Sequence, residues 1–112
     1  MKKILLLSLF TLSFKVFSAD LDCSIRENLD SISEIKLSTV IDQKSSIDSI
    51  SDIDAYVTEK SGGHFIIEAY LADAEMRIFA EGSLLVSEDK LIASSWSRAR
   101  IVELECRLTK KP

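Results

Sequence analysis

Residues 96–108, WSRARIVELECRL, alternate in the character of their side chains. Glutamate and arginine side chains separate the apolar residues toward the end of the segment. The positions that share the apolar parity are Trp96, Val102, Leu104, Cys106 and Leu108. A period of two residues is typical of a strand with one face in the core and one in solvent. The segment therefore predicts a half-buried last strand that points Cys106 inward.

Other segments of the chain indicate strands as well. Residues 34–42 alternate in the same way, and residues 56–59 lead into a Gly-Gly pair that we expect to turn them onto residues 65–71. Residues 69–81 are ambiguous, because many of them are good helix formers. Their charges scatter around a helical wheel but separate cleanly in a strand, so we favour strands there.

The remaining segments leave alternatives open. Residues 21–25 read as a short first strand, whereas a capping-box pattern from Ser24 offers a short helix over residues 26–32. The serine- and aspartate-rich residues 42–54 read as a loop or an irregular edge strand. Residues 76–86 are expected to form a hairpin with the last strand across a polar turn at residues 87–90.

The first nineteen residues, MKKILLLSLFTLSFKVFSA, have the features of a secretory signal peptide. Two lysines precede an apolar stretch that is shorter than the roughly 20 residues needed to span a bilayer. We expect cleavage after Ser18 or Ala19, and the carboxylates at positions 20 and 22 argue against lipid attachment at Cys23. The prediction is a cleaved leader, residues 1–19, and a periplasmic or extracellular chain without membrane insertion.

Cys23 and Cys106 are the two cysteines of the chain. In an oxidising compartment an even pair predicts a disulfide, and two cysteines allow one intramolecular pairing. The fold expected for residues 20–112 is a single all-β domain. It would be a small antiparallel sandwich or barrel of five to seven strands, closed by this disulfide, with one short helix as the open alternative.

The charge of the chain excludes some classes of partner. The leader holds three of the 14 basic residues and none of the 18 acidic ones, so the mature chain carries a net charge of −7. An acidic exported domain is poorly suited to nucleic acid or anionic lipid. A basic protein or an envelope component fits the sign of this charge better.

Trp96, Arg98 and Arg100 share the inward parity of the last strand, where an unpaired guanidinium would be costly. Three arrangements would resolve the conflict. A bulge could turn the arginines outward, inward carboxylates of a neighbouring strand could pair with them, or the three residues could form a ligand patch at an open barrel end.

No other pattern in the sequence predicts a site. His64, the single histidine, has no adjacent nucleophile or carboxylate pattern, and no metal or cofactor is expected. The aspartates among the serines lack the spacing of a calcium loop; they are Asp48, Asp52 and Asp54. Four glutamates are expected on the outward face of the presumed hairpin, either as a solvated surface or as an acidic docking stripe; they are Glu75, Glu81, Glu103 and Glu105.

Three hypotheses about function remain at this point. The first is a non-catalytic exported binding module. The second is an inhibitor of a cationic secreted hydrolase, a lysozyme or a protease, based on the negative charge and the cross-linked scaffold. The third is a small hydrolase or metal-dependent enzyme, for which the sequence shows no catalytic constellation.

The predicted disulfide can be tested by mass spectrometry of the exported protein. Without reductant, alkylation should leave both cysteines unmodified, and reduction should expose two alkylatable thiols. Two reactive thiols in the unreduced exported protein would contradict the pairing.

Overall fold

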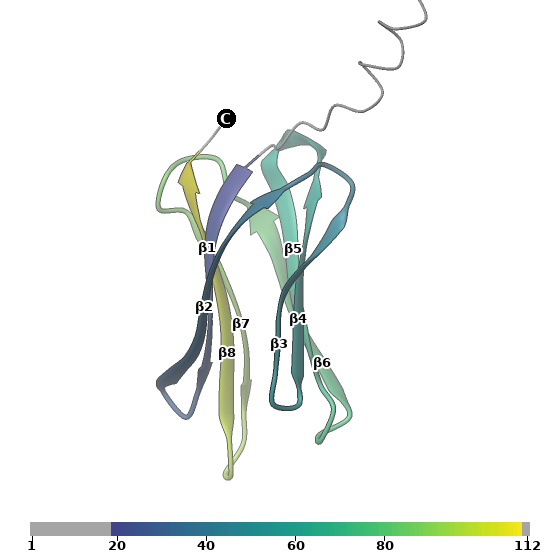
Figure 1. The fold of residues 1–112 in the computed structure, drawn as a ribbon, viewed down its shortest axis with the longest axis vertical. Helices are drawn as coiled ribbons and strands as arrows, with labels where there is room; N and C mark the ends of the chain where they lie inside the picture. Colours follow the sequence, from purple (N-terminus) through teal and green to yellow (C-terminus); the bar gives the residue numbers. More distant parts are fainter. Residues whose placement is uncertain (1–18, 111–112) are drawn as a thin grey trace, which may run out of the picture.

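The computed structural model describes residues 19–110, and these residues are almost entirely β-structure (Figure 1). One short 3₁₀ turn, η1 (Ser61–Gly63), joins two of the strands. Eight strands make up the described chain: β1 (Ala19–Glu27), β2 (Asp30–Thr39), β3 (Lys44–Ile50), β4 (Ile53–Lys60), β5 (His64–Leu71), β6 (Met76–Ser83), β7 (Lys90–Trp96) and β8 (Ile101–Lys110).

The strands form two antiparallel four-stranded sheets that face each other. Sheet A has the order β2-β1-β8-β7 and sheet B the order β3-β4-β5-β6. Around the two sheets the strands follow one another in chain order, because β2 lies next to β3 and β6 next to β7. The first and last strands are then neighbours in the middle of sheet A. Four turns lie together at one end of the sandwich, at the bottom of Figure 1: those between β1 and β2, β3 and β4, β5 and β6, and β7 and β8. We call this the hairpin end.

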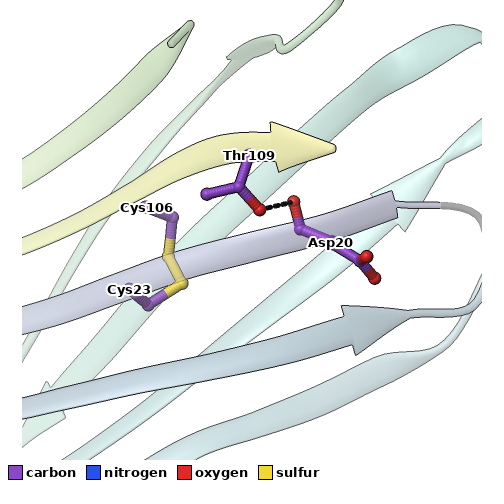
Figure 2. Close-up of a disulfide and its surroundings, with 4 residues drawn as sticks. All are labelled: Asp20, Cys23, Cys106 and Thr109. Carbon is purple, nitrogen blue, oxygen red and sulfur yellow. Dashed lines mark hydrogen bonds between the residues drawn. A yellow bond between two sulfur atoms is a disulfide. The ribbon is translucent and has the colours of Figure 1, made fainter. Parts of the chain in front are cut away.

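The disulfide joins the two central strands of sheet A. Cys23 on β1 lies directly opposite Cys106 on β8, with 4.1 Å between their Cα atoms. Both cysteines are buried, and further along the same pair the Thr109 hydroxyl donates to the Asp20 carbonyl at 3.0 Å (Figure 2). The bond therefore joins two residues 83 positions apart, on the first and last strands of the described chain, within the core.

The core consists of alternate residues from both sheets. In β4 and β8 every second side chain is buried, as the sequence periodicity requires of strands with one solvent-facing side. The largest fully buried side chains are Phe65, Leu21, Ile25, Ile53, Ile67, Leu104 and Leu108. The outer faces of both sheets are left for polar and aromatic side chains.

The predicted all-β sandwich with its disulfide is confirmed, including the first strand and the pairing of β4 with β5. The helices considered over residues 26–32 and 69–81 are wrong, because each region holds a tight turn between two strands. The described chain has eight strands, more than the expected five to seven, partly because the polar segment after Asp42 supplies the edge strand β3. A register shift between Ser46 and Asp48 makes β3 irregular.

The expected hairpin between residues 76–86 and the last strand is wrong. β6 pairs with β5 in sheet B, whereas β7 and β8 pair in sheet A, so the chain crosses between the sheets after β6. Leu84 is buried in this crossing, and the Asp89 carboxylate accepts hydrogen bonds from the backbone N–H groups of Leu85 and Val86. The buried Leu84 therefore lies where the chain passes from one sheet into the other.

The predicted leader falls outside the described residues, apart from Ala19, which is buried and opens β1 opposite Thr39. Within residues 19–110 there is no helix of the length and apolar character that membrane crossing requires.

Removing the disulfide should cost a large part of the stability. For the Cys23→Ala/Cys106→Ala variant we expect the free energy of unfolding to fall by about 4 kcal/mol, because the unfolded chain is no longer closed into one long loop. Urea denaturation of both proteins measures this difference.

Reductant provides the control for this comparison. It should shift the wild-type midpoint toward that of the double variant and leave the double variant unchanged. A difference below about 1 kcal/mol would show that strand pairing holds the chain ends without the bond.

Candidate functional site

The three residues of the predicted ligand patch lie around the turn between β7 and β8. Residues 97–100 form this turn, so Trp96 ends β7 and the last strand begins only at Ile101. The alternation does not continue through the turn. Trp96 is 69% exposed and Arg98 is exposed, whereas the Arg100 side chain turns into the molecule. A ligand patch of these three residues stays a prediction, and the geometry gives Arg100 a different set of contacts.

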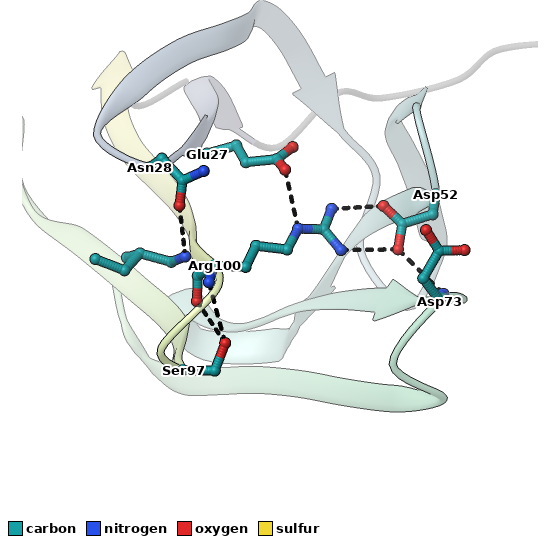
Figure 3. A network of polar contacts seen from close by, with 7 residues as sticks. Glu27, Asn28, Asp52, Asp73, Ser97 and Arg100 are labelled. Carbon is teal, nitrogen blue, oxygen red and sulfur yellow. Dashed lines mark hydrogen bonds and ion pairs between the residues drawn. The ribbon is translucent and has the colours of Figure 1, made fainter.

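Arg100, in the turn between β7 and β8, contacts residues of both sheets at the hairpin end (Figure 3). Its guanidinium donates two hydrogen bonds to Asp52, one of them at 2.9 Å, and its Nε donates to Glu27 at 3.0 Å. Asp52 also accepts a hydrogen bond from the backbone N–H of Asp73, in the turn between β5 and β6. We call Arg100, Asp52 and Glu27 the arginine clamp. The clamp joins sheet A to sheet B through Glu27 at the end of β1 and Asp52 in the turn between β3 and β4.

The clamp favours the charged forms of Asp52 and Arg100. The hydrogen bonds from Arg100 lower the pKa of Asp52 to about 2, against the opposing effect of its burial. The same contact raises the pKa of Arg100. A two-pronged guanidinium–carboxylate pair is geometrically specific, so the clamp holds the two sheets in one relative position at this end.

The other titratable residues considered from the sequence have separate partners. Asp48 accepts from the Ser33 hydroxyl and Asp54 from the Ser49 hydroxyl, so the three aspartates do not converge on one point. In the described part of the chain, no group of histidine, cysteine and carboxylate side chains is arranged to hold a metal ion. His64 lies 3.0 Å from Glu81 on the exposed face of sheet B.

The acidic stripe expected on one hairpin does not form. Glu103 and Glu105 lie on β8 in sheet A, where both pair with Arg26. Glu81 lies on β6 in sheet B, and Glu75 lies in the turn before it. The glutamates are divided between two sheets because the chain crosses between sheets after β6.

A shallow hollow of about 330 Å³ lies on the outer face of sheet A. Its charged lining residues are Asp22, Glu34, Lys36, Glu105 and Arg107. The Arg107 guanidinium lies 3.5 Å from Asp22 and 3.7 Å from Glu88. Charges of both signs are interspersed here, which is typical of a solvated sheet face.

The outer face of sheet B carries a cluster of charged and aromatic side chains. Its members come from all four strands of the sheet: Lys44 from β3, Tyr56 from β4, Glu68 and Tyr70 from β5, and Arg77 and Phe79 from β6. The strand register places Tyr56 and Phe79 on either side of Glu68, and Arg77 beside Tyr70. We call these six residues the Glu68 cluster.

Glu68 is the centre of this cluster and is only 6% exposed. One carboxylate oxygen, Oε1, accepts a hydrogen bond from the Tyr70 hydroxyl at 2.9 Å and lies 3.2 Å from the Lys44 ammonium. The other oxygen, Oε2, accepts from Arg77 at 3.2 Å. A buried carboxylate is stable when such donors replace water, and here they do so on the outside of a sheet.

Aromatic rings surround the two cations of the cluster. The rings of Tyr56 and Tyr70 meet edge to face, with 6.0 Å between their centroids. The Lys44 ammonium lies 4.9 Å from the centroid of the Tyr56 ring and 5.8 Å from that of the Tyr70 ring. The Arg77 guanidinium covers the Phe79 ring at 4.6 Å. These distances are those of cation–π contacts.

The hydrogen-bond donors around Glu68 favour its ionised form. Burial alone raises the pKa of this carboxyl, but the hydrogen bonds from Tyr70, Arg77 and Lys44 outweigh burial, so the pKa lies below its ordinary value. An ionised carboxylate that makes ion pairs with two cations suits cation binding better than proton transfer. Phe79 is 53% exposed and Tyr70 39% exposed, so the cluster also presents aromatic surface to solvent.

One sequence signal for this cluster was available. Glu68 is the single charged residue in the apolar run of residues 65–71. The sequence does not show which side chains stand beside it, because that depends on the register of three strand pairs. The aromatic and basic members lie between 9 and 24 positions away in the chain, apart from its near neighbour Tyr70.

Comparison with known proteins gives no relative for this chain. No protein-family model, no curated protein and no solved structure matches it.

The arginine clamp predicts a pH dependence of stability. A carboxyl with a lowered pKa in the folded state stabilises the fold above its ordinary pKa near 4, and the contribution is lost as the pH falls toward 2. We expect Asp52→Asn to lower the free energy of unfolding by about 1 kcal/mol at pH 6, and the difference from wild type to shrink as the pH falls toward 2. Urea denaturation across this pH range measures the difference.

Asp73→Asn is the matched control, because the Asp73 side chain makes none of the clamp contacts. It should show no comparable pH-dependent difference. If the difference in free energy of unfolding between Asp52→Asn and wild type stayed constant from pH 6 to pH 2, the charge of Asp52 would not be the source of the effect.

Proposed function

We propose that this chain is an exported, non-catalytic binding module that recognises a basic protein or another cationic component of the cell envelope through the outer face of sheet B. The observation that carries this proposal is the buried Glu68 carboxylate, set among aromatic rings on the outside of a sheet. Such rings supply large contact area at a small cost in conformational entropy, and they are enriched at binding sites.

The charge balance supports a cationic partner. Residues 19–110 carry 18 acidic and 10 basic side chains. A negative domain attracts a positive partner over distances of about a Debye length and speeds their encounter. An inhibitor of a cationic secreted hydrolase is the special case in which the basic partner is an enzyme, and the rigid two-sheet scaffold suits it.

A non-catalytic role fits the chemistry of the described side chains. Both cysteines are joined in the disulfide, and the side-chain partner of His64 within residues 19–110 is the Glu81 carboxylate, on an open sheet face. Catalysis of acyl or phosphoryl transfer requires a positioned nucleophile and its base, or a metal ion, in a site that excludes water.

The proposal can be tested by capture from envelope extract with immobilised wild-type protein and surface variants. Phe79→Ser removes exposed aromatic area from sheet B and should weaken retention of the captured component about tenfold, as expected for an aromatic residue central to an interface. Raising the salt concentration should release the component.

Trp96→Ser is the matched control, because it removes an aromatic side chain that is also more than half exposed, but from sheet A. Loss of capture with Trp96→Ser alone would favour the patch predicted from the sequence instead. Capture that neither salt nor Phe79→Ser weakens would contradict the proposal, provided that thermal unfolding shows both variants to be folded.

A further inference from the structure

The Lys44 ammonium occupies a site built from groups of other strands. Three groups contact it: the Glu68 carboxylate at 3.2 Å and the rings of Tyr56 and Tyr70 at 4.9 and 5.8 Å. A carboxylate with two tyrosine rings is a recurrent way to bind an organic cation, because ring faces and carboxylate are all negative. We call these three groups the ammonium seat.

We propose that the ammonium seat binds a lysine side chain of the protein partner, and that this lysine replaces Lys44. The proposal rests on the binding function proposed above and names the group that would be recognised. Lys44 then acts as an internal competitor, which closes the seat in the free protein and moves into solvent in the complex.

The position of Lys44 makes this exchange feasible. Lys44 is the first residue of the edge strand β3, and its side chain is 47% exposed. Glu68, by contrast, lies on a central strand and is fixed on its other oxygen by Arg77 at 3.2 Å. The acceptor is therefore held in place, whereas the cation stands at the edge of the sheet on a flexible chain of methylene groups.

The chemistry of the seat selects a primary ammonium over other cations. One oxygen of Glu68 already pairs with Arg77, and the second accepts from the Tyr70 hydroxyl and from one further donor, the Lys44 ammonium. A guanidinium would require both carboxylate oxygens for its preferred two-pronged contact. A compact ammonium needs one oxygen and the faces of the two rings.

The experiment uses a short poly-lysine chain as the probe and calorimetry at physiological ionic strength. Lys44→Ala should bind the probe about threefold more tightly than Lys60→Ala, a factor in the range of one exposed cation–π contact. Lys60→Ala is the matched control, because it removes the same charge from β4 at an exposed position on the same sheet face. Adding Glu68→Gln to Lys44→Ala should abolish the gain.

A second measurement tests the ammonium seat with a small monovalent ligand in place of poly-lysine. n-Butylammonium has the shape of the lysine side chain, so it should raise the thermal midpoint of Lys44→Ala more than that of Lys60→Ala, whereas neutral 1-butanol should not discriminate between them. Equal poly-lysine affinities of the two lysine variants, or equal shifts with n-butylammonium, would overturn the proposed seat.

The outcomes separate this inference from the binding function on which it rests. A partner whose capture depends on Phe79, combined with equal probe affinities of the two lysine variants, would leave the binding module intact and remove the lysine seat. Conversely, Lys44→Ala could bind the probes more tightly than Lys60→Ala while no captured partner depends on Phe79. That outcome would support the ammonium seat and contradict its proposed role in binding a protein partner.

Discussion

The pairing of β1 with β8 is the constraint on which the rest of the structure depends. It brings the two ends of the described chain together in the middle of sheet A, and the disulfide between Cys23 and Cys106 holds the register of the pair. With these strands fixed, β2 and β7 complete sheet A on either side of the pair, and the four strands from β3 to β6 form sheet B. The two-sheet architecture follows from this closure, because each strand then lies next to its neighbours in the chain.

The arginine clamp complements the disulfide at the hairpin end. The disulfide acts within sheet A, whereas Arg100 reaches Asp52 in the turn between the first two strands of sheet B. Hydrophobic burial between the sheets has no direction, so it does not by itself set their relative position. A two-pronged ion pair at the end of the sandwich supplies that specificity. The rigid scaffold leaves the outer face of sheet B as a preorganised surface, which lowers the entropy lost on binding.

The sequence predicted individual strands better than their partners. Alternation marked β8 and β2, and the Gly-Gly pair marked the hairpin of β4 and β5, because side-chain period and turn chemistry are local properties. The hairpin assumed between β6 and the last strand was wrong, because the crossing depends on burial of Leu84 between the sheets. Trp96 was assigned to the wrong strand for a related reason. The turn at residues 97–100 interrupts an alternation that seemed continuous.

The amino-acid sequence by itself determined the strand character, the inward direction of Cys106 and its pairing with Cys23, because periodicity and cysteine count need no partner strand. Tertiary structure alone decided the two-sheet arrangement, the role of Arg100 and the Glu68 cluster. In that cluster, residues from four strands become neighbours through three strand registers. Register arises from long-range pairing and packing, and a shift of one residue would turn Glu68 into the core and remove the cluster.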